Sequence, residues 1–173
     1  GVSVGPGDPE LMTLKAVRLL EHCPVIASPV TQNGHALAWE TASRAVDLRA
    51  KTRLELRFPM DGTPETRRAA RLTAADAVEN VLRSGRDVAM LTLGDASFYS
   101  TFSLLSEILR ARGYRNVVIP GVPSFCAAAA LSLAAALFVE LHTWPADIDG
   151  ANLAEAVKTL YMMFGCTLFN LYK

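Results

Sequence analysis

Cysteine and histidine are scarce in this sequence, and their scarcity limits the chemistry available to it. The 173 residues include three of each. The odd number and wide spacing of Cys23, Cys126 and Cys166 favour reduced thiols in a cytoplasmic protein over a disulfide framework. No histidines and cysteines share a metal-ligand spacing, so the sequence predicts no metal site. It also lacks a recognisable Ser/His/Asp set, a CxxC pair and a G-x-x-x-x-G-K-[ST] phosphate loop.

An excess of charge and a long apolar run are missing as well. Lys plus Arg and Asp plus Glu each number 17, so no global field favours nucleic acid or an anionic membrane as a partner. The longest apolar run, 125–139, is interrupted by Ser132 and is too short to span a bilayer, and no signal peptide is visible. With 51% apolar and 20% charged residues, we expect a soluble globular protein of one domain or two small ones.

Apolar runs alternate with amphipathic stretches along most of the chain. We expect a helix that begins at Asp8-Pro9, where aspartate is a good N-cap and proline suits the first helical position. Further strands are expected at 24–27, 53–58, 88–93 and 116–120, and further helices at 37–48 and 63–85. This alternation predicts an α/β fold with a mostly parallel sheet and right-handed crossovers.

The last fifty residues read as the start of a second α/β domain. An alanine-rich helix is followed by strand, helix and strand at 137–143, 151–162 and 166–172. We therefore expect two domains, 1–120 and 121–173. Two strands and one or two helices would leave a sheet face uncovered, so the second domain is expected to be incomplete in this chain.

The stretch around Gly94-Asp95 is the strongest candidate for a binding site. It follows an apolar run, 88–93, and precedes a stretch with helical spacing. Open α/β sheets bind ligands at the carboxyl ends of their strands, and a glycine there lets a ligand approach the backbone. A small-molecule site is one interpretation; a simple turn in which Asp95 caps the next helix is the other.

Three turns of this kind carry a resemblance to a known family. Val4-Gly5-Pro6-Gly7-Asp8-Pro9 and Leu93-Gly94-Asp95-Ala96-Ser97-Phe98-Tyr99-Ser100-Thr101 resemble the two signatures of the tetrapyrrole methylases, S-adenosylmethionine-dependent methyltransferases of corrin and sirohaem synthesis. Ser97-Phe98-Tyr99-Ser100-Thr101 and Pro120-Gly121-Val122-Pro123-Ser124-Phe125 are similar to the branch that methylates carbon 20 of precorrin-2 or of its cobalt counterpart. The resemblance covers residues 1–130 and is weak beyond them, although 167–173 is similar to a second-domain strand of the family.

The resemblance implies a two-domain fold, a homodimer and S-adenosylmethionine bound between the domains. The residues that it implies for the cofactor are Pro6, Leu93, Gly94, Asp95, Phe98, Ser124, Phe125 and Tyr172. Ala96 stands where this branch commonly has proline, and Pro123 where the family commonly has serine or threonine. Pro123 removes a hydroxyl and an amide donor that could have met the cofactor.

The chemistry that the resemblance implies needs no protein nucleophile. The sulfonium methyl is itself the electrophile, so the protein mainly binds, aligns and excludes water, and no catalytic residue is assigned. For the tetrapyrrole we expect Tyr99, Ser100 and Thr101 near the reacting carbon, the segment 28–35 as a wall, and arginines for the carboxylates. The candidate arginines are Arg67, Arg68 and Arg71, for which a solvated helix face is the alternative.

Other functions stay open at this point. The same fold could methylate another tetrapyrrole position, a protein or an RNA, and the zero net charge argues mildly against RNA. A non-catalytic, degenerate copy is the remaining alternative.

Overall fold

The computed structural model describes residues 1–31, 33–59 and 61–131. The chain divides into two compact units, Gly1–Val122 and Pro123–Lys173. In the second unit the described residues form helix α5, Ser124–Leu131. The strands and helix expected within 137–172 lie outside the described residues.

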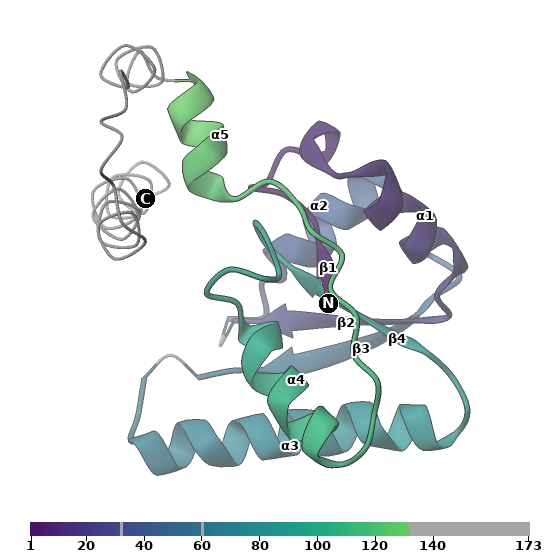
Figure 1. Ribbon diagram of the computed structural model, residues 1–173, viewed down its shortest axis with the longest axis vertical. Coiled ribbons are helices and arrows are strands. Elements are labelled where there is room, and N and C mark those ends of the chain that lie inside the picture. Colours follow the sequence, from purple (N-terminus) through teal and green to yellow (C-terminus); the bar gives the residue numbers. More distant parts are fainter. Residues whose placement is uncertain (32, 60, 132–173) are drawn as a thin grey trace, which may run out of the picture. The chain divides into compact units, whose positions relative to one another are not determined.

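The first unit is built on a four-stranded parallel sheet (Figure 1). Its strands are β1 (Val2–Ser3), β2 (Val25–Val30), β3 (Thr52–Arg57) and β4 (Val88–Thr92), in the order β1-β4-β2-β3. All three pairings are parallel, so every strand ends at the same edge of the sheet. The expected α/β class with a parallel sheet is confirmed.

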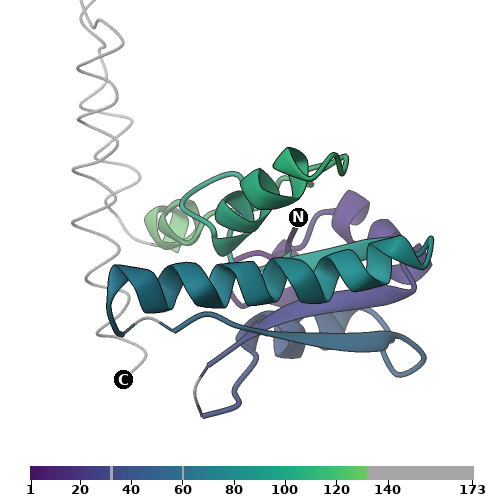
Figure 2. The ribbon, with the colours of Figure 1, turned by 90° about the horizontal axis from the view of Figure 1, so that it is seen from below.

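Helices cover both faces of this sheet, and strand alternation decides which residues each pair of helices contacts. Ile26 and Leu91 pack in a cluster with α1 (Leu14–His22) and α2 (Leu37–Ala45). Ala27 and Met90, one residue away, pack with α3 (Pro64–Arg83) and α4 (Thr101–Ala111) on the other face. Figure 2 shows α3 running along the sheet beside α4. Both faces are thus buried, as a parallel sheet requires.

The helix expected from Asp8 is divided in two. Asp8 caps the short 3₁₀-helix η1 (Pro9–Leu11) by accepting a hydrogen bond from the Glu10 amide at 2.9 Å. The chain then becomes extended at Met12, and α1 begins after a second cap, Thr13, which accepts from the Ala16 amide at 3.2 Å. A threonine cap competes with continuation of the first helix, and Met12, 8% exposed, reaches the core at the break.

Two strand predictions also need correction. The strand expected at 116–120 is a single parallel bridge, Val2↔Ile119, because Ile119 alone is buried there while Val117 and Val118 are 53% and 40% exposed. Conversely, β2 runs beyond the expected 24–27, through Pro29. At Pro29 the strand pairs with β3 but no longer with β4, and a proline is tolerated where one side of a strand is open.

Candidate functional site

Two glycine loops interlock at the carboxyl edge of the sheet. Gly5 follows β1 and Gly94 follows β4, and each accepts a backbone hydrogen bond from the other, at 2.7 Å from the Gly94 amide and 3.3 Å from the Gly5 amide. Both have left-handed backbones, with φ of 72° and 75°. Glycine adopts this conformation without the steric cost that a side chain brings, which explains its presence in both signature turns.

A third loop packs against the other two. Gly121 donates its amide to Asp95 Oδ2 at 2.8 Å, and a Cβ placed on Gly121 would lie 2.4 Å from the Cβ of Ser3. The fully buried Ser3 hydroxyl donates to the Ile119 carbonyl at 2.6 Å and accepts from the Ala96 amide at 2.8 Å. The three signature segments found in the sequence therefore form one hydrogen-bonded junction.

The Asp95 carboxylate is bound within this junction. Its Oδ1 accepts from the amide of Ser97 at 2.6 Å and from the Ser97 hydroxyl, and its Oδ2 accepts from Gly121. Burial raises the pKa of Asp95, but the hydrogen bonds from Ser97 and Gly121 outweigh burial and hold the pKa below its usual range. The interpretation of Asp95 as the cap of the next helix is wrong, because Ser100 is the N-cap of α4.

A pocket of about 430 Å³ opens at the same edge, beside the junction. It contains Tyr99, Ser100 and Thr101, which were the three residues expected near the reacting carbon, and part of the segment 28–35. The lining comes from the ends of β2, β3 and β4 and from the first turns of α2 and α4: Pro29, Val30, Thr31, His35, Leu37, Ala38, Phe58, Asp61, Thr92, Leu93, Tyr99, Ser100 and Thr101. Sequence reasoning missed Thr92, Phe58 and Asp61; the positions of Thr92 at the end of β4 and of Phe58 just after β3 were a usable signal, whereas Asp61 lies in the loop before α3.

Tyr99 has an unusual backbone on the wall of this pocket. Its φ is 46°, the one left-handed backbone among the described residues other than glycine. Its ring packs edge-on against Phe98, with centroids 5.0 Å apart, and the residue is 72% exposed. Strain of this kind is concentrated at functional sites, since a compact fold otherwise selects against it.

The expected cofactor residues are distributed over both units. In the first unit, Leu93 (43% exposed) lines the pocket, Gly94 and Asp95 belong to the junction, and Phe98 (39% exposed) and Pro6 lie on the adjoining loops. Ser124 and Phe125 belong to α5 in the second unit. Tyr172 lies outside the described residues.

The three candidate arginines do not line the pocket. Arg67, Arg68 and Arg71 belong to the first two turns of α3, and Arg67 and Arg68 are exposed. Because α3 follows β3, its first turn starts from the carboxyl edge, on the side where the pocket opens. The structure therefore brings the arginines to the same edge without placing them in the lining.

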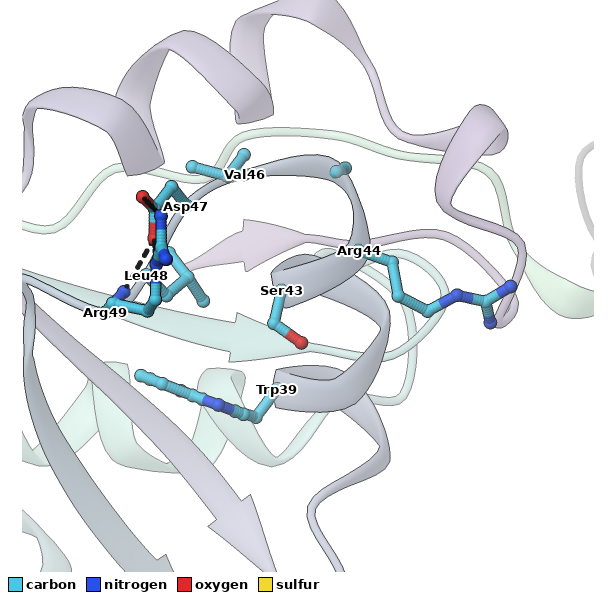
Figure 3. Close-up of a pocket in the computed structure, with 8 residues that line it drawn as sticks. Trp39, Ser43, Arg44, Val46, Asp47, Leu48 and Arg49 are labelled. Atoms are coloured by element: carbon cyan, nitrogen blue, oxygen red, sulfur yellow. Dashed lines mark hydrogen bonds and ion pairs between the residues drawn. The ribbon is translucent and has the colours of Figure 1, made fainter.

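A second pocket of about 420 Å³ lies at the other end of α2 (Figure 3). Trp39 and Ser43 line it from the helix, and Asp47 and Arg49, which form an ion pair 2.7 Å long, line it from the segment after the helix. The Arg53 guanidinium lies 4.8 Å from the centroid of the Trp39 ring. None of the residues expected to bind cofactor or substrate is in this lining.

The described part of the chain offers neither a membrane-spanning helix nor a cluster of metal-binding side chains. No helix there is long and apolar enough to cross a membrane. Over the same residues, no three His, Cys, Asp or Glu side chains are grouped so that they could hold a metal ion.

Comparison with known proteins adds independent findings. Residues 1–160 match the family model "Tetrapyrrole (Corrin/Porphyrin) Methylases". Over 135 residues the chain is 38% identical to a Methanocaldococcus jannaschii protein named probable cobalt-precorrin-2 C(20)-methyltransferase, covering 77% of this chain and 56% of that one. It is 31% identical over 130 residues to the Salmonella typhimurium cobalt-precorrin-2 C(20)-methyltransferase, covering 75% and 54%.

A solved structure shares the fold. The uroporphyrin-III-C-methyltransferase of Thermus thermophilus superposes with a TM-score of 0.51 at 27% identity, covering 76% of this chain and 52% of that one. The chain thus spans slightly more than half the length of these relatives.

Proposed function

The chain belongs to the tetrapyrrole (corrin/porphyrin) methylases, and on that premise we propose that it methylates carbon 20 of precorrin-2 or of its cobalt counterpart with S-adenosylmethionine, in corrin synthesis. The observation that carries the proposal is the junction of three signature loops beside a pocket that contains Tyr99, Ser100 and Thr101. The relatives from Methanocaldococcus and Salmonella, whose names specify carbon 20, support the same position.

The residues at the junction fit S-adenosylmethionine. A Cβ placed on Gly7 would meet no atom within 4 Å, so the backbone there is open to a ligand. Leu93 and Phe98, both more than a third exposed, offer apolar surface for an adenine ring beside it. We assign Pro6, Leu93, Gly94, Asp95 and Phe98 to the cofactor from the first unit. The remaining assigned residues are Ser124, Phe125 and Tyr172.

The cofactor, when bound, supplies the electrophilic methyl group. The protein's part is then to hold donor and acceptor in line and to exclude water. Asp95, through Ser97 and Gly121, fixes the two loops on which the cofactor would lie. Tyr99, Ser100 and Thr101, at the pocket wall, would orient the macrocycle.

The assembly and location proposed with this function are a homodimer in the cytoplasm. The homodimer follows from the family resemblance, and the cytoplasmic location follows from the reduced cysteines that the sequence favours. Light scattering on the whole protein tests the proposed dimer. A molar mass equal to that of a single subunit would contradict it.

The function is tested with the whole protein and a matched pair of glycine variants. Binding of S-adenosylhomocysteine is measured by calorimetry, and methyl transfer from labelled S-adenosylmethionine is assayed with precorrin-2 and its cobalt form side by side. Gly94→Ala should lower the affinity for the cofactor at least about tenfold, because a side chain at this φ of 75° displaces the loop. Gly85→Ala is the control, since Gly85 has the same φ but follows α3 at the opposite edge. Methylation of another tetrapyrrole, a protein or RNA, or no cofactor binding at all, would replace the proposed function with the corresponding alternative.

A further inference from the structure

A buried hydroxyl without a partner belongs to one of the residues that line the carboxyl-edge pocket. Thr92 is the last residue of β4 and is 7% exposed, and it contributes to the lining. Its Oγ1 is buried and has no hydrogen-bond partner among residues 1–31, 33–59 and 61–131. Because burying a hydroxyl without a hydrogen bond is unfavourable, a group of this kind indicates a missing partner.

The direction of the Thr92 side chain is fixed by the sheet. Thr92 pairs with Ser3, and its carbonyl accepts from the Val4 amide at 2.9 Å. Alternation along β4 puts Thr92 on the face of Met90, which packs against α3 and α4. The hydroxyl therefore lies on the side of the sheet from which α4 begins.

The N-terminus of α4 meets the same pocket. Ser100, its N-cap, and Thr101, its first residue, both line the cavity. The Ser100 hydroxyl oxygen accepts from the Ser103 amide at 3.3 Å. The amides of Thr101 and Phe102, which precede Ser103 in the helix, are not capped by this hydrogen bond. The first amides of a helix have no partner within the helix, and the helix dipole attracts an anion to them.

The other polar side chains of the pocket include groups that can donate a hydrogen bond, and the rest of the lining is largely apolar. Thr31 and His35 contribute a hydroxyl and an imidazole, and Asp61 is the one carboxylate among the described lining residues. Val30, Leu37, Phe58 and Leu93 supply the apolar part. A ligand with an anionic oxygen group on an apolar body matches this lining better than a cation or a purely polar molecule does.

We propose that Thr92 Oγ1 and the first amides of α4 bind one carboxylate of the ligand in this pocket. The identity of the ligand rests on the proposed function, and two sources of a carboxylate follow from it. One is an acidic side chain of the tetrapyrrole, to which we assign the site. The other is the amino-acid end of the cofactor.

The test compares Thr92→Val with Thr41→Val in the whole protein. Valine keeps the shape of threonine and removes the hydroxyl. Thr41 is equally buried, at 5% exposed, but its hydroxyl donates to the Leu37 carbonyl at 2.9 Å and it is outside the lining. Three ligands are titrated: a porphyrin with eight carboxylates, S-adenosylhomocysteine, and sodium propionate with the amide resonance of Thr101 as readout.

Thr92→Val should weaken the binding of the porphyrin about tenfold and leave the affinity for S-adenosylhomocysteine unchanged. The unfolding temperature should not fall, because the hydroxyl forms its hydrogen bond with the ligand and not with the protein. Thr41→Val should leave both affinities unchanged. If Thr92→Val instead lowers the affinity for S-adenosylhomocysteine, the carboxylate site is supported, but the carboxylate that it binds belongs to the cofactor. Unchanged affinity for both ligands, or a loss of stability in Thr92→Val as large as in Thr41→Val, would overturn the proposal.

The propionate titration separates this inference from the proposed function. A propionate-dependent shift of the Thr101 amide that Thr92→Val abolishes supports the carboxylate site even if the protein transfers no methyl group. Methyl transfer to the tetrapyrrole without any such shift supports the function and counts against the site.

Discussion

Asp95 holds two loops together through one carboxylate, and this role is separate from any contact with a ligand. Its oxygens accept from Ser97 on its own loop and from Gly121 on another. Removing the charge while keeping the shape should therefore weaken the junction before it affects the ligand.

Asp95→Asn should lower the free energy of unfolding by about 1–3 kcal/mol at pH 7, because an amide cannot accept from both Ser97 and Gly121 as the carboxylate does. Asp8→Asn is the control, since asparagine caps a helix about as well as aspartate does. Both are measured by urea unfolding. An equal loss in the two variants would contradict the structural role of Asp95.

The pH dependence of stability follows from the same residue. The pKa of Asp95 is lower in the folded protein than its ordinary value of about 3.9, so its contribution is present above that value. The contribution is lost as the pH falls through the lower folded pKa. Stability should therefore fall less steeply below pH ~4 in Asp95→Asn than in the unchanged protein, as measured by urea unfolding at a series of pH values.

Tyr99 is the residue where stability and function should oppose one another. Its left-handed backbone, with φ of 46°, disfavours a large side chain, while asparagine tolerates it. Tyr99→Asn should raise the free energy of unfolding by up to about 1 kcal/mol and weaken tetrapyrrole binding. Thermal unfolding and porphyrin titration measure the two effects. If Tyr99→Asn is less stable but binds the porphyrin as tightly as the unchanged protein does, the tyrosine contributes to the fold and not to binding.

Ser100, the N-cap of α4, lies at the point where this helix begins beside the pocket. Ser100 is 7% exposed, and its hydroxyl donates to the Ala96 carbonyl at 2.5 Å and accepts from the Ser103 amide. The Thr63 cap of α3 is exposed and accepts from Thr66 at 3.3 Å. The two caps are chemically alike but differ in burial.

Ser100→Ala should cost about 1–2 kcal/mol and speed hydrogen exchange in the first turn of α4, because it loses a cap and leaves buried groups unpaired. Thr63→Ala should cost less, about 0.5–1 kcal/mol, since water can replace the exposed hydroxyl. Urea unfolding gives the difference. Equal costs would mean that burial of the cap contributes nothing.

The elements also show what sequence reasoning could reach. Long periodic stretches were predicted well: the helix expected at 63–85 is α3, which ends at Arg83 with Gly85 in a left-handed conformation just beyond it. Local rules failed where two signals competed, as with the caps at Asp8 and Thr13. The prediction of a strand at 116–120 was wrong for another reason, because the length of the paired segment depended on which residues the sheet edge could bury.

The site shows the same division. The motifs predicted which loops meet, because parallel strands bring their carboxyl ends to one edge. The bonds of Asp95 with Gly121 and the unpaired hydroxyl of Thr92 could not be predicted, since each depends on distances between segments far apart in the chain.

At the scale of the whole molecule, the arginines of α3 test how an anionic substrate is attracted. Arg67, Arg68 and Arg71 lie near the start of the helix that leaves the carboxyl edge, and none lines the pocket. They would thus act on the tetrapyrrole's carboxylates at the rim, in addition to the proposed carboxylate site on α4. Exposed charge pairs contribute only about 0–1 kcal/mol each, so no single arginine should be decisive.

Replacing all three arginines by alanine should raise the Michaelis constant for the tetrapyrrole about tenfold, with less effect at high salt, and leave S-adenosylhomocysteine affinity unchanged. The matched control replaces three exposed arginines elsewhere, Arg18, Arg86 and Arg110, which removes the same net charge. Steady-state kinetics at two ionic strengths measures both variants. An equal rise in the control would assign the effect to net charge, and no rise in either would leave the α3 arginines as a solvated helix face, with substrate orientation then depending on the pocket itself.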